Sequence, residues 1–173
     1  MTPFGHLSVS IIASKKIPNK YSVSLGYIII GGLIPDIDFL AYLFGNLNSF
    51  HRTYTHSIGF LMICLTIIFL LNRYNNQLKN ILSSFSIGFM LHLIIDAGLD
   101  SNYSNGIGIP MFLPFYDGYI YWFSSFIDTT GNTVSQVSWN NPVQFVREKI
   151  FYILLIESPF YIYAIILLRK NRK

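Results

Sequence analysis

Residues 31–57, with the sequence GGLIPDIDFLAYLFGNLNSFHRTYTHS, decide the fold because they place a dense group of polar side chains inside an apolar chain. These side chains are two carboxylates, two imidazoles and one guanidinium: Asp36, Asp38, His51, His56 and Arg52. Imidazole nitrogens and carboxylate oxygens are common ligands of divalent metal ions in proteins. The stretch therefore predicts a metal site.

The other two of the four histidines also lie where they could reach this site. His6 lies near the start of the chain, and His92 precedes Asp96 by four residues. On a helix, a spacing of four places two side chains on one face, about one turn apart, so that both can bind one ion. We therefore predict six metal ligands: His6, Asp36, Asp38, His56, His92 and Asp96.

The composition is that of a membrane protein. Of the 173 residues 52% are hydrophobic and only 12% are charged, whereas about a quarter of the residues of a soluble protein are charged. Apolar runs at 58–71, 81–99 and 150–168 approach the roughly 20 residues that a helical span needs. We predict an all-α fold, a polytopic membrane helix bundle of about five helices that forms a single domain over residues 1–173, with the polar metal site at one end.

Residues that cap helices and residues that end them predict the helix boundaries. Pro35 should end the second helix, because the residue before a proline is disfavoured in helical geometry. Thr55 or Ser57 should cap the third helix, with His56 in its first turn. Segment 39–50 is expected to form a short interfacial helix and a loop, and the aromatic segment 100–146 a partly interfacial region. The expected helices are 3–14, 22–33, a third that begins after its cap at Thr55 or Ser57 and continues to 71, 78–98 and 148–168.

Short connections make consecutive helices antiparallel, so the predicted ligands should meet at one end of the bundle. Basic residues lie in the turns and tail of the other end: Lys15, Lys16, Lys20, Arg73, Lys79 and residues 169–173. Basic loops tend to stay in the cytoplasm. We predict a multi-pass protein of the inner (cytoplasmic) membrane whose site faces outward. Because the basic clusters flank apolar runs, they indicate a lipid bilayer as partner, and no nucleic acid is expected.

The predicted ligands define the chemistry. The single cysteine, Cys64, excludes thiolate zinc sites and disulfides, which leaves nitrogen and oxygen ligands. The candidates exceed one tetrahedral site, so we expect two ions of Zn, Mn or Fe. Paired ions activate water and clamp phosphate oxygens. Arg52 would bind substrate charge, and His51 would be a ligand or proton carrier. The predicted function is hydrolysis of a phosphoester, with lipids or lipid-linked molecules as candidate substrates.

Other interpretations remain open from sequence. His92 and Asp96 could be a simple side-chain pair on a helix, and Glu157, a single acid in the last apolar run, could join the site. For the whole chain, the alternative is a non-catalytic membrane protein, such as a metal-binding transporter or a scaffold. A hydrolase requires a coordination position open to water and a cleft beside it, whereas a structural metal site is closed.

These motifs resemble those of the LexA-regulated, membrane-bound metal-dependent hydrolase family of bacteria and archaea. The resemblance covers the chain to about residue 120 and rests on five features: His6, PDID at 35–38, HRTYTHS at 51–57, HLIID at 92–96 and GIPMFLPF at 108–115. In place of that family's Thr-rich link, this chain has GLDSNYSNGIG at 98–108. The order of histidines and aspartates is also similar, more weakly, to that of helical zinc-dependent phospholipases C. The resemblance implies a membrane-bound, metal-dependent hydrolase.

Overall fold

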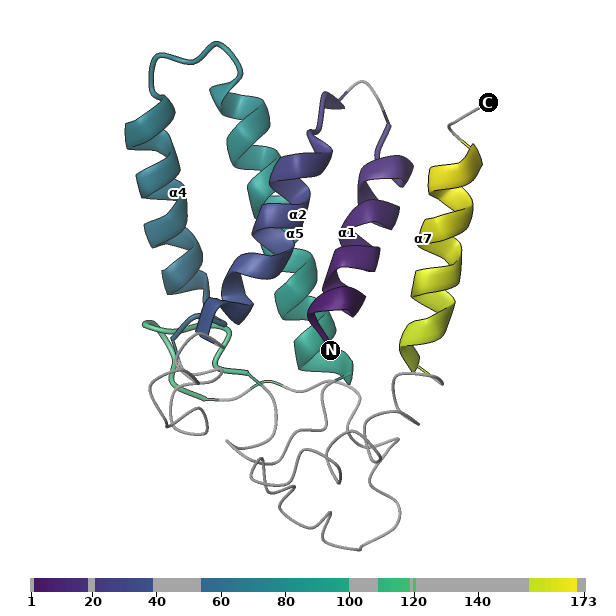
Figure 1. The fold of residues 1–173 in the computed structure, drawn as a ribbon. Coiled ribbons are helices and arrows are strands. Elements are labelled where there is room, and N and C mark those ends of the chain that lie inside the picture. The colour runs from purple at the N-terminus through teal and green to yellow at the C-terminus, as the bar shows by residue number, and fades with distance from the viewer. Residues whose placement is uncertain are drawn as a thin grey trace, which may run out of the picture.

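The computed structural model describes residues 2–18, 21–38, 54–99, 109–118, 120 and 156–170. The described helices run side by side, as Figure 1 shows. They are α1 (Pro3–Lys16), α2 (Leu25–Leu33), α4 (Ile58–Asn72), α5 (Leu78–Leu99) and α7 (Ser158–Lys170). Within these ranges the only β contact is an isolated bridge between Ile109 and Ile120. The predicted helical character is confirmed.

Helix α1 starts as the sequence predicts and ends two residues later. Pro3 occupies its first position, where the missing N–H costs nothing. Thr2 caps the helix, and its hydroxyl accepts a hydrogen bond of 3.2 Å from the amide of Gly5. α1 packs against both α2 and α7. This packing places the buried side chain of His6 inside the bundle.

Helices α2 and α5 approach each other closely through glycines. A Cβ added to Gly31 would lie 2.2 Å from the carbonyl oxygen of Phe85, and one added to Gly88 would lie 2.0 Å from that of Ile28. Small residues allow such backbone contact between membrane helices. As predicted, α2 ends before Pro35, and residues 34–38 form a 3₁₀ turn. The close packing holds this turn beside α5.

The start of α4 is fixed by its cap and by a distant segment. The hydroxyl of Ser57 accepts a hydrogen bond of 3.1 Å from the amide of Phe60, which confirms Ser57 as the cap. His56 lies just before the cap, so its predicted place in the first turn was wrong. The amides of residues 58 and 59 donate to the carbonyl oxygens of Met111 and Leu113, each over 2.8 Å. Segment 109–116, green in Figure 1, is thereby held against α4.

Among the described residues, one helix is both long and apolar enough to cross a membrane, the stretch Leu78–Gly98 of α5. The apolar stretch Ile58–Asn72 is shorter. A multi-pass arrangement therefore stays a prediction. Segment 39–50 lies outside the described residues, as does most of 100–146. The last helix was predicted from residue 148; its described part begins at Ser158 and continues to Lys170.

The two ends of the bundle differ in charge, as predicted. The end of α1 with Lys15 and Lys16, the turn between α4 and α5 that begins at Arg73, and the end of α7 with Arg169 and Lys170 all lie at the top of Figure 1. The start of α1 and the end of α5 lie at the opposite end. The predicted ligands in α1 and α5 therefore lie away from the basic residues.

Candidate metal centre

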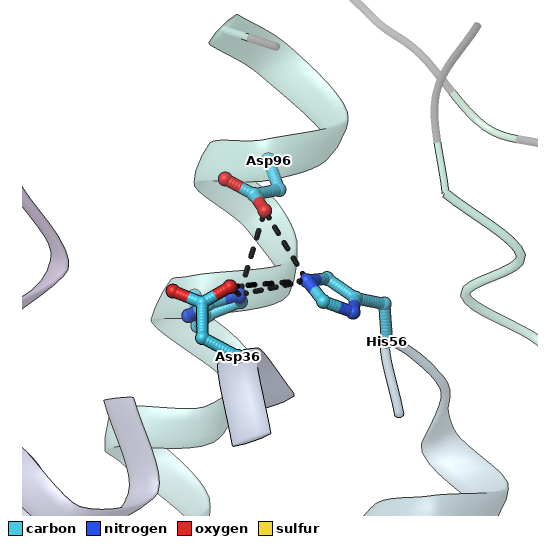
Figure 2. A group of neighbouring side chains, drawn as sticks. Asp36, His56 and Asp96 are labelled. Carbon is cyan, nitrogen blue, oxygen red and sulfur yellow. Dashed lines mark hydrogen bonds and ion pairs between the residues drawn. The ribbon is translucent and has the colours of Figure 1, made fainter. Parts of the chain in front are cut away.

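Four buried side chains from three parts of the fold meet at the end opposite the basic residues. They are Asp36 after α2, His56 before α4, and His92 and Asp96 in α5. Figure 2 labels Asp36, His56 and Asp96. Each offers one ligand atom, and these four atoms all lie within 4.8 Å of one another. The helix ends thus bring together residues that are up to 60 positions apart in the chain.

The spacing of these atoms suits one tetrahedral ion. The Nε2 atoms of His56 and His92 are 3.1 Å apart, and Oδ2 of Asp96 is 3.4 Å from each of them. Oδ1 of Asp36 is 3.6 Å from Nε2 of His56 and 3.7 Å from Nε2 of His92. An ion with bonds of about 2.0–2.2 Å keeps tetrahedral ligands about 3.3–3.6 Å apart. The group therefore has the dimensions of a metal site.

The backbone of α2 orients His92. Nδ1 of His92 lies 2.8 Å from the carbonyl oxygen of Gly32, which can only accept a hydrogen bond. Nδ1 must therefore carry the proton in the neutral ring, and the lone pair of Nε2 points to the group of four. Such an outer hydrogen bond is typical of metal-bound histidines. Sequence reasoning missed Gly32, because a backbone carbonyl leaves no signal in a motif.

Two side chains, Thr55 and Asp38, lie beside Nδ1 of His56, the ring nitrogen that points away from the group of four. The hydroxyl of Thr55 donates to Oδ2 of Asp38 over 2.8 Å and lies 3.1 Å from Nδ1 of His56. Oδ2 of Asp38 is itself 3.7 Å from the same Nδ1. Asp38 thus faces the ring nitrogen that points away from the group of four. Thr55, which the sequence suggested only as a helix cap, belongs to the surroundings of the site.

His6 approaches the group from α1. Its ring stacks on that of His92, with centroids 3.7 Å apart and an angle of 19° between the planes. Its Nε2 lies 3.1 Å from Oδ1 of Asp96, the oxygen opposite the one that faces the other histidines. Both Nδ1 of His6 and Oδ2 of Asp36 are buried without a hydrogen-bond partner in the part of the chain that the structure describes. Buried polar atoms without partners are costly, so these donors fit a bound cation.

Electrostatics favour a cation in the same place. Burial lowers the pKa of His56, but the nearby carboxylates of Asp36 and Asp96 outweigh this effect and raise the pKa above its ordinary value. Burial by itself would raise the pKa of Asp36, but the contact with His56 and the charge of His92 hold this pKa below its ordinary value. Two carboxylates close together attract positive charge. A divalent ion would neutralise both.

Of the three other candidate residues, the structure describes only Glu157. His51 and Arg52, predicted to act on the substrate, lie outside the described residues. Glu157, which could have joined the site, instead accepts hydrogen bonds from the amide of Thr2 over 2.7 Å and from its hydroxyl over 2.5 Å. It also accepts a hydrogen bond from the hydroxyl of Tyr161. Glu157 therefore connects α7 to the start of α1.

Comparison with known proteins gives one family. The family model described as YdjM inner membrane protein matches residues 1–171, which is almost the entire chain. No curated protein and no solved structure matches. The inner-membrane part of the resemblance found in the sequence is thereby confirmed. Its hydrolase part and the similarity to phospholipases C stay predictions.

Proposed function

Because the chain belongs to the YdjM inner membrane protein family, and because its described part carries a buried Asp/His group of metal-site dimensions, we propose that it is a membrane-bound, metal-dependent phosphoester hydrolase. The observation that carries the proposal is the set of four ligand atoms within 4.8 Å, contributed by Asp36, His56, His92 and Asp96. Ionisable residues at membrane depth are costly and commonly functional.

The donor atoms divide into two sets. Oδ1 of Asp36, Nε2 of His56, Nε2 of His92 and Oδ2 of Asp96 would hold one ion. The remaining oxygens of the two carboxylates and the ring of His6 would be available to hold a second ion. Nitrogen and oxygen donors of this kind suit Zn, Mn or Fe. When bound, such ions supply an activated water and neutralise phosphate charge.

The protein's own side chains have separate roles in this proposal. Asp38 and Thr55 orient the imidazole of His56 through Nδ1 and so act outside the coordination sphere. Arg52 holds the substrate phosphate by paired N–H donors, and His51 binds metal or carries a proton; both roles come from the sequence.

The proposal is tested with the purified full-length chain by measuring metal content and hydrolysis of p-nitrophenyl phosphate. Arg52→Ala should keep its metal and lose turnover by roughly 10- to 100-fold, because a charge-assisted hydrogen bond contributes about 1.5–3 kcal/mol. Arg73→Ala, at the opposite end of the bundle, should behave like the parent protein. Loss of metal from Arg52→Ala would show that its role is misassigned. A metal-loaded parent protein with no activity on this phosphoester or on phospholipids would favour the transporter or scaffold.

A second prediction concerns orientation in the inner membrane. Lys15, Lys16 and the α4–α5 turn should be cytoplasmic, and the metal site should face outward. In a Cys64→Ala background, an impermeant maleimide added to intact cells should label Tyr116→Cys and leave Asn76→Cys unlabelled. Both positions are exposed in the structure. Labelling of Asn76→Cys alone would show that the protein has the opposite orientation in the membrane. The proposed chemistry would be unaffected by this result.

A further inference from the structure

Glu157, which lies just before α7, is a fully buried carboxylate that the proposed chemistry does not use. Both of its oxygens bind Thr2: Oε1 accepts a hydrogen bond of 2.7 Å from the amide, and Oε2 accepts one of 2.5 Å from the hydroxyl. Tyr161, one turn further along the chain, donates its hydroxyl to the same Oε2. Burial of a carboxylate is costly unless hydrogen bonds replace those to water. Three donors offset this cost at Glu157.

Thr2 connects the carboxylate to the first turn of α1. The hydroxyl of Thr2 accepts a hydrogen bond of 3.2 Å from the amide of Gly5, and its carbonyl oxygen accepts one of 3.1 Å from the amide of His6. Negative charge stabilises the N-terminus of a helix, yet α1 has no acidic residue in its own first turn. Glu157 supplies this charge from the start of α7, which Figure 1 shows at the same end of the bundle. The carboxylate therefore fixes the end of α1 that carries His6.

The ring of His6 depends on its helix more than the other two buried imidazoles do. Nδ1 of His92 is bound by the carbonyl oxygen of Gly32, and Nδ1 of His56 lies beside the hydroxyl of Thr55. Neither ring nitrogen of His6 has a hydrogen-bond partner in the part of the chain that the structure describes. Its ring nevertheless stacks on that of His92, with centroids 3.7 Å apart. The place of this ring is therefore set by the backbone of α1.

We propose that Glu157 is a positioning residue, which holds His6 in the metal centre by binding Thr2 at the start of α1. Glu157 is not a ligand itself and acts through His6, the candidate ligand of a second ion, so the proposal rests on the proposed function. Metal–ligand distances vary by only about 0.2 Å. A small shift of α1 would therefore weaken the bond from His6. Breaking the bonds between Glu157 and Thr2 should weaken metal binding although every ligand is still present.

The experiment is a double-mutant cycle on the full-length chain, read out as zinc affinity. Glu157→Gln keeps the size of the side chain, but its amide nitrogen cannot accept a hydrogen bond from Thr2. Zinc affinity should fall roughly 10- to 100-fold, the factor that corresponds to about 1.5–3 kcal/mol for a hydrogen bond to a charged group. His6→Ala should lower it at least as far. In the His6→Ala background, Glu157→Gln should cause no further loss, because it acts through the missing imidazole.

Ser84→Ala is the matched control for stability. The buried hydroxyl of Ser84 accepts a hydrogen bond of 2.9 Å from the amide of Ser24, at the start of α2 and at the opposite end of the bundle. This variant loses a buried bond to a helix start but should keep the zinc affinity of the parent protein. Thr2→Val removes the hydroxyl that binds Glu157 and should reproduce the loss if Glu157→Gln does not fold. Thr2→Ser retains this hydroxyl and should bind zinc like the parent protein.

Labelling with diethyl pyrocarbonate, located by mass spectrometry in metal-free protein, reports the burial of His6 independently of zinc. The label on His6 should rise about tenfold in Glu157→Gln, because the start of α1 opens more often, and the label on His92 should not change. Unchanged labelling of His6 would overturn the proposal. A full further loss of zinc affinity in the His6→Ala background, or an equal loss in Ser84→Ala, would also overturn it.

Hydrolysis of p-nitrophenyl phosphate, measured on the same samples, separates this proposal from the proposed function. Zinc binding that depends on Glu157 through His6, without any hydrolysis, would support the positioning role and refute the hydrolase. Hydrolysis by the parent protein, together with parent-like zinc affinity in Glu157→Gln, would support the hydrolase and refute the positioning role.

Discussion

Replacing Asp96 by asparagine is expected to release the metal and to abolish the stabilisation that the metal gives. Asp96 contacts the group with both oxygens: Oδ1 lies 3.1 Å from Nε2 of His6, and Oδ2 lies 3.4 Å from Nε2 of both His56 and His92. A neutral amide is a weaker metal ligand than a carboxylate. The substitution also removes one of the two carboxylate charges in the group of four. At a metal concentration of 100 times Kd, the parent protein should gain about 2.7 kcal/mol, or roughly 5–11 °C in Tm.

Thermal unfolding with and without metal, together with metal analysis, measures this effect. The Asp96→Asn protein should show almost no metal-dependent shift. Asp117→Asn, an exposed aspartate in the segment after α5, should keep the full shift. Because asparagine and aspartate have nearly the same size, the Asp96→Asn protein and the parent protein should unfold at similar temperatures when both are free of metal. Full metal content and a full shift in Asp96→Asn would show that the wrong residues are assigned to the site.

The second large effect is expected from Gly88→Ala, which adds one methyl group where α5 meets α2. Its Cβ would lie 2.0 Å from the carbonyl oxygen of Ile28 and 2.8 Å from the amide nitrogen of Gly32. Both atoms are backbone, so α2 must move away. Such overpacking typically costs about 1–3 kcal/mol. Because the carbonyl of Gly32 orients His92, metal affinity should also fall roughly 10- to 100-fold.

Gly26→Ala provides the control on the same pair of helices. A Cβ at Gly26 would meet nothing within 4 Å, and this exposed residue lies in the first turn of α2. Alanine should stabilise the helix by up to about 1 kcal/mol and leave metal binding unchanged. Denaturant unfolding and metal titration compare the two variants. Parent-like stability and affinity in Gly88→Ala would contradict the close approach of α2 and α5.

The elements that the sequence predicted well are those with local signals. Pro35 ended α2, Ser57 capped α4, and the spacing of His92 and Asp96 placed both on one face of α5. Antiparallel connections were then enough to bring these ends together. The end of α2 and the start of α4 could therefore be predicted from rules that act within a few residues, and antiparallel connections then predicted the convergence of the ligands. The start of α2 was predicted at residue 22 and lies at Leu25.

The roles of the two aspartates in PDID could not be separated from sequence. Asp36 and Asp38 are two residues apart on a 3₁₀ turn, which has three residues per turn, so they point in different directions. Asp36 reaches the group of four, and Asp38 lies behind the imidazole of His56. Which of the two faces inward depends on the packing of α2 on α5. That packing is a tertiary contact with no local pattern.

The contact between α4 and segment 109–116 has a consequence for the order of events during biosynthesis. The ribosome makes residues 58 and 59 about fifty residues before Met111 and Leu113, whose carbonyl oxygens accept their hydrogen bonds. Unpaired amides are costly in an apolar medium. The start of α4 therefore acquires its partners only after the chain has passed residue 113. His56, two residues before Ile58, belongs to a portion of the protein that is completed late, although it is translated early.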